Sequence, residues 1–287
     1  MKPIRGKGLA CILVVLGLLL SPLGGKPALA GGGDGDTKLA VGAAVLGVIG
    51  TSALAYGLWR NRPSQQDKKE PGLFPGEFYV GGYLGGSLVQ NTNLNYLSSI
   101  SPAGGGKVTT NRQKFDPAVV GGVKIGYFMQ SIPYLGFEIE TNYSRCAVGK
   151  QQVTLSRPVN GSTVAFLPND SWVNWTMAAH VVGRYGFLRD DEVPFGRLQP
   201  YVGIGPGLVV LYDEVDAAKN FAIDVMAGVR YMMLKNVSAF VEYKFSHQWD
   251  VELESHSFVA ADGTLQRGTA TFDYTSHRIV LGVAYHF

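Results

Sequence analysis

Apolar residues occupy alternate positions in eight segments between residue 76 and the C-terminus. In the sixth segment, for example, Phe221, Ile223 and Val225 share one face, and Asp224 and Arg230 share the other. A period of two residues is typical of β-strands and excludes helices for these stretches. The sequence therefore predicts an all-β fold, with strands at approximately 76–90, 116–130, 135–150, 171–188, 198–213, 220–234, 237–253 and 269–287.

The connections between these segments alternate in length. The first, at about 91–115, is long and polar, whereas the second is only "SIPY". The third is long again, and the sixth is only "KN". Long loops at one end and short turns at the other are typical of an antiparallel up-and-down β-barrel that spans an outer membrane. The fifth connection, "EVDAAK", is short where this pattern predicts a long one.

The less apolar face of the segments carries charges in the middle of the strands. An eight-stranded barrel has an interior just wide enough for its own side chains. Because an unpaired buried charge is costly, such an interior should be nearly neutral. The charges number four negative and five positive, and we predict that they form a lumen charge network: Lys124, Glu138, Glu140, Arg184, Asp224, Arg230, Glu242, Lys244 and Arg278.

Aromatic residues mark both ends of the apolar face, as expected for the two interfaces of a bilayer. Trp175 to Tyr185 and Phe221 to Tyr231 each match the roughly 9–11 residues with which a tilted strand crosses a membrane. The charged content of 16% is also below the roughly 25% of soluble domains. The two predicted aromatic girdles are Tyr127, Tyr185, Phe187, Tyr231 and Tyr285 near the short turns, and Tyr143, Trp175, Tyr212, Phe221 and Trp249 near the long loops.

The N-terminal region has a different composition from the segments that follow. Residues 1–30 have the charged start, apolar core and A-x-A site of a cleaved signal peptide. Residues 31–60 contain a short Ala/Gly-rich apolar segment, Leu39 to Trp59, which is expected to be an exported helix. The alternative is an inner-membrane anchor, because this segment is long enough to span a bilayer. Residues 61–75 are polar and are predicted to be a linker to the barrel domain, 76–287.

Several stretches resemble a known family. "FYVGGYLGGS", "PYVGIGPG", "AGVRYMMLKNVSAFVEYKF" and "HRIVLGVAYHF" are similar to the OmpA-like small outer-membrane barrels, the "porin family" outer membrane protein β-barrel domain. The resemblance covers about residues 76–287. It implies the outer membrane of a Gram-negative cell, and it implies that Phe287 ends the strand read by the barrel-assembly machinery. The peptidoglycan-binding domain of OmpA is absent from this sequence, so wall anchoring is not implied.

Three functions are compatible with these features. The first is a non-enzymatic structural or surface-interaction barrel, whose partners are outer-membrane lipids, the assembly machinery and an extracellular ligand of the long loops. The second is a narrow porin-like channel, because glycine stripes such as Gly203, Gly205 and Gly207 could open a water path. The third, a lipid hydrolase or acyltransferase, is disfavoured because the adjacent pairs Ser246/His247 and Ser276/His277 should point to opposite faces.

No motif for a cofactor, a metal ion or nucleic acid stands out in the sequence. The net charge of +3 is modest and lacks a basic cluster with interleaved aromatic residues, so nucleic acid is not expected as a partner. Cys11 and Cys146 are the two cysteines, and removal of residues 1–30 would leave one. An internal disulfide and a Cys-only metal site are therefore excluded for the mature chain. His180, on the charged face, is expected to be a hydrogen-bonded interior residue or a pH-sensitive group.

Overall fold

The computed structural model describes residues 76–97, 107–213 and 216–287, and the predicted signal peptide, apolar segment and linker lie outside them. Within these ranges no helix has the length and hydropathy needed to cross a membrane. The strands pair antiparallel throughout. They are β1 (Gly76–Val89), β2 (Thr92–Leu97), β3 (Val108–Gln113), β4 (Ala118–Met129), β5 (Leu135–Val148), β6 (Gln151–Val159), β7 (Ser162–Leu167), β8 (Asp170–Arg184), β9 (Leu198–Tyr212), β10 (Ala217–Leu234), β11 (Val237–Ala260) and β12 (Leu265–His286).

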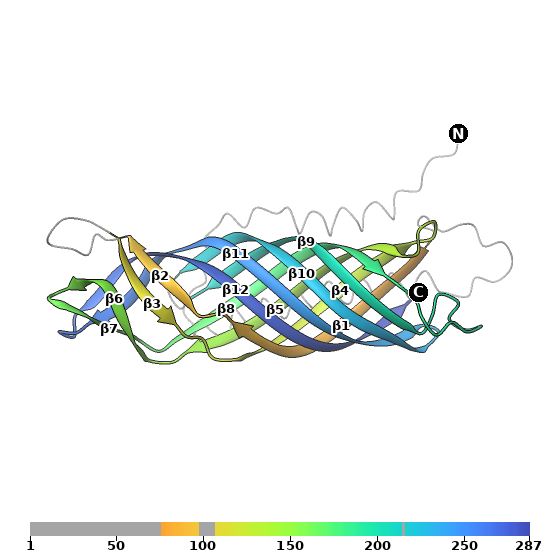
Figure 1. Cartoon of the computed structure of the whole chain (residues 1–287), viewed down its shortest axis with the longest axis horizontal. Coiled ribbons are helices and arrows are strands. Elements are labelled where there is room, and N and C mark those ends of the chain that lie inside the picture. Colours follow the sequence, from red (N-terminus) through yellow and green to blue (C-terminus); the bar gives the residue numbers. More distant parts are fainter. Residues whose placement is uncertain (1–75, 98–106, 214–215) are drawn as a thin grey trace, which may run out of the picture. The chain divides into compact units, whose positions relative to one another are not determined.

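Eight of these strands close into one ring. Its order is β1, β12, β11, β10, β9, β8, β5 and β4, and β4 pairs again with β1. Each strand of the ring corresponds to one of the eight segments predicted from the alternation, and most ends agree within three residues. The predicted all-β, eight-stranded antiparallel barrel is therefore confirmed (Figure 1).

The long connections are not irregular loops, as the sequence pattern suggested, but contain further strands. A second closed ring of six strands is formed by β2, β3, β6 and β7 together with the parts of β11 and β12 next to the turn that connects them, which we call their upper parts. We call this second ring the head, and we define its share of β11 and β12 as residues 251–260 and 265–274. The two rings share the β11–β12 hairpin, which continues from one into the other (Figure 1).

Local irregularities explain why the strands of the head are harder to recognise in the sequence than those of the ring. β11 has register shifts between Gln248 and Val251 and between Leu253 and His256. Each irregularity breaks the strict alternation, so the alternation predicts a strand end at residue 253. The β6–β7 turn, by contrast, carries a clear signal: Asn160 and Gly161 both have positive φ angles, of 51° and 80°. This pair is the typical sequence of a two-residue hairpin turn.

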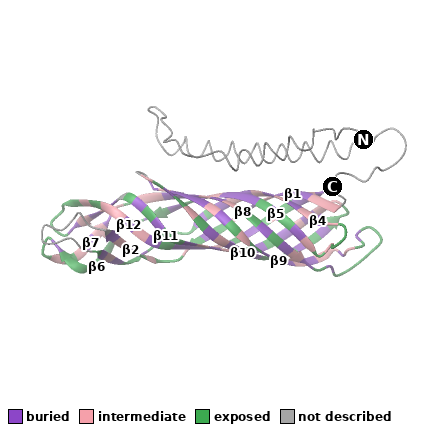
Figure 2. Ribbon diagram, turned by 90° about the horizontal axis from the view of Figure 1, so that it is seen from above, coloured by how far each residue is buried: buried purple, intermediate pink, exposed green. Residues whose placement is uncertain are grey.

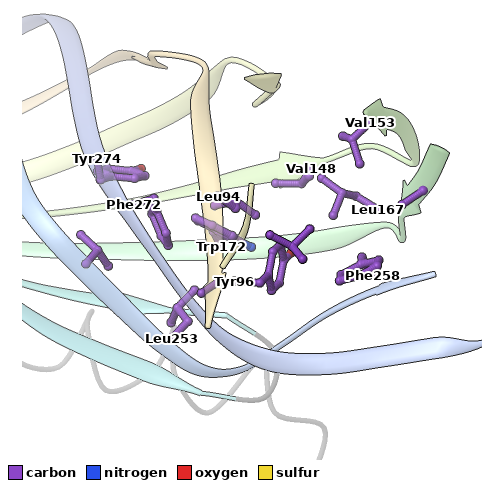
Figure 3. Close-up of a cluster of buried hydrophobic side chains, with 14 of the residues drawn as sticks. Leu94, Tyr96, Val148, Val153, Leu167, Trp172, Leu253, Phe258, Phe272 and Tyr274 are labelled. Carbon is purple, nitrogen blue, oxygen red and sulfur yellow. The ribbon is translucent and has the colours of Figure 1, made fainter. Parts of the chain in front are cut away.

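The interior changes from polar to apolar along the same strands. On β12, Ser276 and Arg278 are buried inside the ring, whereas Phe272 and Tyr274 are buried in the head. The outward face changes from apolar to polar: Ile279 is exposed on the ring part of β12, and Asp273 is exposed on its head part. Buried and exposed residues alternate along the strands of the ring (Figure 2). The ring therefore has a polar interior and an apolar exterior. The head, by contrast, is built like a water-soluble domain with an apolar core (Figure 3).

The exterior of the ring is a continuous apolar surface. Leu84, Val119 and Leu281 are 68%, 74% and 64% exposed, and they come from neighbouring strands. A monomeric soluble protein rarely exposes an apolar surface of such extent. Together with the buried charges of the interior, this surface requires a hydrocarbon surrounding for the ring but not for the head.

Gly205 allows β9 to approach its neighbour β8 closely. A Cβ atom on Gly205 would lie only 1.8 Å from the carbonyl oxygen of Ala179. The ladder between β8 and β9 lacks the pairs around Pro206, whose nitrogen cannot donate a hydrogen bond. This glycine therefore makes room for the neighbouring backbone.

We expect Gly205→Ala to destabilise the ring by about 1–3 kcal/mol, the usual cost of overpacking a filled interior. The measurement is the denaturant midpoint of the folded band on an unboiled gel, with the protein in detergent. Gly183→Ala is the matched control, because a Cβ at Gly183 on the adjacent strand meets no atom within 4 Å. Equal midpoints for the two variants would contradict the close approach.

Candidate functional site

The interior of the ring contains charged side chains at three levels. At the short-turn end, Arg184 binds Glu77 through two hydrogen bonds, of 2.5 and 3.0 Å. Glu77 also accepts a hydrogen bond from His286 at 2.6 Å. The guanidinium of Arg184 lies over the ring of Phe128, 3.6 Å from its centroid. Glu77 was not among the predicted interior charges, because it stands at the very start of its strand.

The middle level is a chain of five ionisable side chains. Lys124 contacts Glu138 at 3.3 Å and is paired with Glu242. Lys244 contacts the same Glu242 at 3.2 Å and contacts Glu140 at 2.5 Å. All five side chains are fully buried, and they come from β4, β5 and β11. The two lysines are therefore each held between carboxylates on opposite walls of the barrel.

The third level lies nearer to the head. Asp224 contacts His180 at 3.0 Å and Arg278 at 3.7 Å. Arg278 also donates a hydrogen bond to Asn142 at 2.9 Å. These polar groups lie on β5, β8, β10 and β12, so this level also ties distant strands together. His180 is thus a buried hydrogen-bonded residue.

Arg230 differs from the other predicted charges because it has no ion pair among the described residues. Its guanidinium lies 4.2 Å from the centroid of the Tyr79 ring and 5.3 Å from that of Tyr201. Cation–π contacts of this kind are stronger when the cation is desolvated, as it is here. With Glu77 included, the interior contains five negative and five positive groups, so its formal charge is balanced.

The structure brings together eight of the nine predicted charges in ion pairs, and all nine are buried. Three of the buried groups also form a possible metal-ligating set, Glu138, Glu140 and His180. Lys124 and Lys244 already lie against these two carboxylates, so protein cations supply the neutralising charge there. A second set, which includes Asp213 and His256, lies beside the head core.

The predicted aromatic residues lie at the two ends of the ring on its outer side. At the short-turn end, Tyr185 and Phe187 are half exposed, and the centroids of their rings lie 4.9 Å apart. At the head end, Trp175 pairs with Tyr143 across two strands and donates a hydrogen bond to Thr141. Phe221 and Trp249 are exposed there as well. Their roles as membrane girdles remain predictions.

Phe287 completes the pairing at the short-turn end. Its backbone nitrogen donates a hydrogen bond to Phe78 at 2.8 Å, and its ring contacts those of Phe78 and Tyr285. The last residue therefore belongs to the barrel wall next to the first strand.

The serine–histidine pairs considered for hydrolysis are separated by the barrel wall. Ser246 and Ser276 are buried in the interior, whereas His277 contacts Tyr243 on the outside. His247 likewise contacts Thr275 rather than its neighbouring serine. Neither adjacent pair therefore has the hydrogen bond between nucleophile and base that such catalysis needs.

A comparison with protein-family models gives one match over residues 41–287, the outer membrane protein β-barrel domain. The chain belongs to this family. Its location is accordingly the outer membrane of a Gram-negative cell, and in such barrels the short turns face the periplasm and the longer loops face the exterior. The head is therefore on the outside of the cell.

Solved structures with similar folds have low sequence identity. The outer membrane protein OprG from Pseudomonas aeruginosa is 14% identical, with a TM-score of 0.45, and the match covers 74% of this chain and 96% of that one. Neisserial surface protein A is 14% identical, with a TM-score of 0.41, and the match covers 73% of this chain and 97% of that one. The outer membrane protease OmpT from Escherichia coli is 10% identical, with a TM-score of 0.38, and the match covers 78% of this chain and 99% of that one. The comparison with curated proteins gave no match. At these identities and scores, the likeness indicates no shared activity.

Proposed function

We propose that this protein is a non-enzymatic outer-membrane barrel with a structural or surface-interaction role, in which the ring holds the head at the cell surface. The observation that carries this proposal is the apolar core of the head, which lies across the outer end of the polar interior. Val148 at the end of β5 and Trp172 near the start of β8 belong to the same buried cluster as Phe258 of the head (Figure 3). A water path through the ring would have to cross this cluster.

The packing of the ring interior also supports a closed barrel. Every cation of the middle level contacts a carboxylate, and tyrosine side chains fill the space between them. Tyr79, for example, occupies the space beside Gly126, where a Cβ would lie 2.1 Å from its ring. Two partners follow from this proposal: outer-membrane lipids around the ring, and the barrel-assembly machinery, which would read the final strand through Phe287.

The head offers a surface for an extracellular ligand. A polar groove of about 460 Å³ opens beside β2, β3 and the upper part of β12. It combines the cations Lys107 and Arg112 with the carboxylates Asp250 and Asp273 and with amide side chains. We propose that the head, and not the ring interior, contacts molecules outside the cell.

Planar-bilayer recording separates this proposal from the channel alternative. We expect the purified full chain to insert without a steady open conductance level, because ion pairs and an apolar core lie in series along the axis. A general porin inserted under the same conditions provides the positive control. A stable open level of the wild-type protein would overturn the closed-barrel proposal and support a narrow channel.

A further inference from the structure

The polar groove of the head opens where β12 changes its partner strand. β12 pairs with β2 up to Thr271 and with β1 from Ser276, and Asp273 of the groove lies between the two stretches. β11 is irregular at the same height, because its register with β12 shifts between Gln248 and Val251. The hollow of about 460 Å³ is therefore a consequence of how the ring continues into the head.

Two residues that line the groove have positive φ angles although they are not glycine. They are Arg112, at 49°, and Asp250, at 46°. The backbone nitrogen of Arg112 donates a hydrogen bond of 2.9 Å to the side chain of Asn93. That of Asp250 donates a hydrogen bond of 3.1 Å to the carboxylate of Asp273. Side chains of the groove thus hold both unusual conformations, and backbone of this kind is typical of binding sites.

The charges of the groove are sorted by strand. Lys107 and Arg112 lie at the two ends of β3, whereas Asp250 and Asp273 belong to β11 and β12. The strand between these two sides is β2, which pairs with β3 on one edge and with β12 on the other. All four charged residues are exposed, and none of them forms an ion pair with another described residue. A ligand in the groove therefore meets cations on one side and carboxylates on the other.

Amide side chains from β2 lie between the two charged sides. The side-chain oxygen of Asn93 is taken by the backbone of Arg112. That of Asn95 accepts a hydrogen bond of 2.9 Å from the hydroxyl of Thr109. The amide nitrogens of Asn93 and Asn95 have no partner among the described residues, so the N–H donors of both remain for a ligand.

This set of donors and acceptors argues against simpler ligands. The two carboxylates would repel a polyanion, and the two cations would repel a polycation. An apolar molecule would cover polar groups without pairing them, which is costly. Arginine is well suited to a carboxylate or phosphate group, whereas an ionised carboxylate accepts hydrogen bonds from hydroxyl groups. Five of the ten lining residues are asparagine or threonine, which favours a ligand with many hydroxyls over a peptide with two point charges.

We propose that the groove binds an acidic saccharide, that is, a sugar unit that carries a carboxylate or phosphate group beside free hydroxyls. The acid group binds Lys107 and Arg112, and the hydroxyls donate hydrogen bonds to Asp250 and Asp273. The volume lies within the roughly 300–1,000 Å³ of small-molecule sites. This inference rests on the proposed surface role of the head and adds the chemical class of its ligand.

The test is saccharide binding by the full chain in phospholipid nanodiscs that contain no lipopolysaccharide. We expect isothermal titration with digalacturonate, a dimer of an acidic sugar, to give one site per chain. Lactose, a neutral dimer, should bind at least about 10-fold more weakly, because it makes no hydrogen bond between two charged groups. Arg112→Gln should weaken digalacturonate binding by a similar factor.

Further variants make the result specific to the groove. Asp273→Asn should also weaken binding, because one acceptor oxygen is lost while the other can still hold the backbone of Asp250. Arg267→Gln and Asp116→Asn are the matched controls, since both residues are exposed charges that do not line the groove. Both control variants should bind digalacturonate normally. If Arg112→Gln loses the gel shift of the folded ring, Lys107→Gln decides in its place.

A second arm distinguishes two sources of such a sugar. Lipopolysaccharide is then added to the nanodiscs before the titration with digalacturonate. Loss of digalacturonate binding would mean that the groove takes an acidic sugar of the cell's own outer leaflet. Unchanged binding would mean that the ligand comes from outside the membrane. Both results support the proposal.

Three results would overturn the proposal. They are no binding of digalacturonate by the wild type, equal binding of lactose, and unchanged binding by Arg112→Gln together with Asp273→Asn. Tighter binding of diglycine, a zwitterionic peptide, would also overturn it. The planar-bilayer recording is a separate measurement. A closed barrel that binds no saccharide would refute only this inference, and an open channel that binds digalacturonate would refute only the closed barrel.

Discussion

Lys244→Met is expected to destabilise the barrel by about 3–5 kcal/mol, the usual cost of removing one partner of a buried ion pair. Lys244 contacts both Glu140 and Glu242 at the centre of the ring, and all three side chains are inaccessible to solvent. Its loss leaves Glu140 without its cation and Glu242 with Lys124 alone. The measurement is the urea midpoint of the folded band on an unboiled gel, with the protein in detergent micelles.

Two variants test whether this loss has the stated electrostatic cause. Arg197→Met also removes a cation that contacts two carboxylates, Asp190 and Glu192, but in an accessible periplasmic loop, where we expect little change in the midpoint. Glu140→Gln combined with Lys244→Met should recover part of the lost stability, because it removes one of the uncompensated charges. Equal losses for Lys244→Met and Arg197→Met would argue against a desolvated ion-pair chain.

Leu253→Ala is expected to destabilise the head by about 2–5 kcal/mol, because it leaves a cavity in the apolar core. Leu253 is 0% exposed and belongs to the cluster that contains Trp172 and Phe258. The effect should be local: hydrogen–deuterium exchange should increase in β2, β3, β6 and β7, while β4 in the ring stays protected. The gel shift that reports the folded ring should also persist.

Leu265→Ala provides the comparison for this variant. Leu265 lies on the strand paired with β11 in the head but is 53% exposed, so its truncation should leave exchange in the head unchanged. Faster exchange throughout both rings in Leu253→Ala would mean that head and ring unfold as one unit. That outcome would contradict a separate apolar core.

The ring could be predicted from sequence because one face of each segment meets hydrocarbon along its whole length, so apolar residues recur at every second position. Ile279, Leu281 and Val283 alternate with Arg278, Val280 and Gly282, and the same alternation recurs in every segment. Nine of the ring's ten interior charges form ion pairs, and most of the partners are far apart in sequence; Lys124 and Glu242, for example, are 118 residues apart. The pattern predicted that such charges would be buried but could not assign their partners.

The head was not predicted because its signals are local and weak. Its strands β2, β3 and β7 have six residues each, and bulges interrupt the alternation of β11. The turn at Asn160–Gly161 was the one strong signal, and it indicates the β6–β7 hairpin. The set Asp170, Asp213 and His256 has no sequence motif, because its members come from β8, from the residue after β9 and from β11.

The hairpin formed by β11 and β12 follows every other described strand in the sequence, and it is common to both rings. Neither the charged interior below nor the apolar core above can close before this hairpin is in place. Nascent or truncated chains that lack it would present unpaired strand edges in two different environments at once. Closure of both halves of the molecule thus depends on a single hairpin.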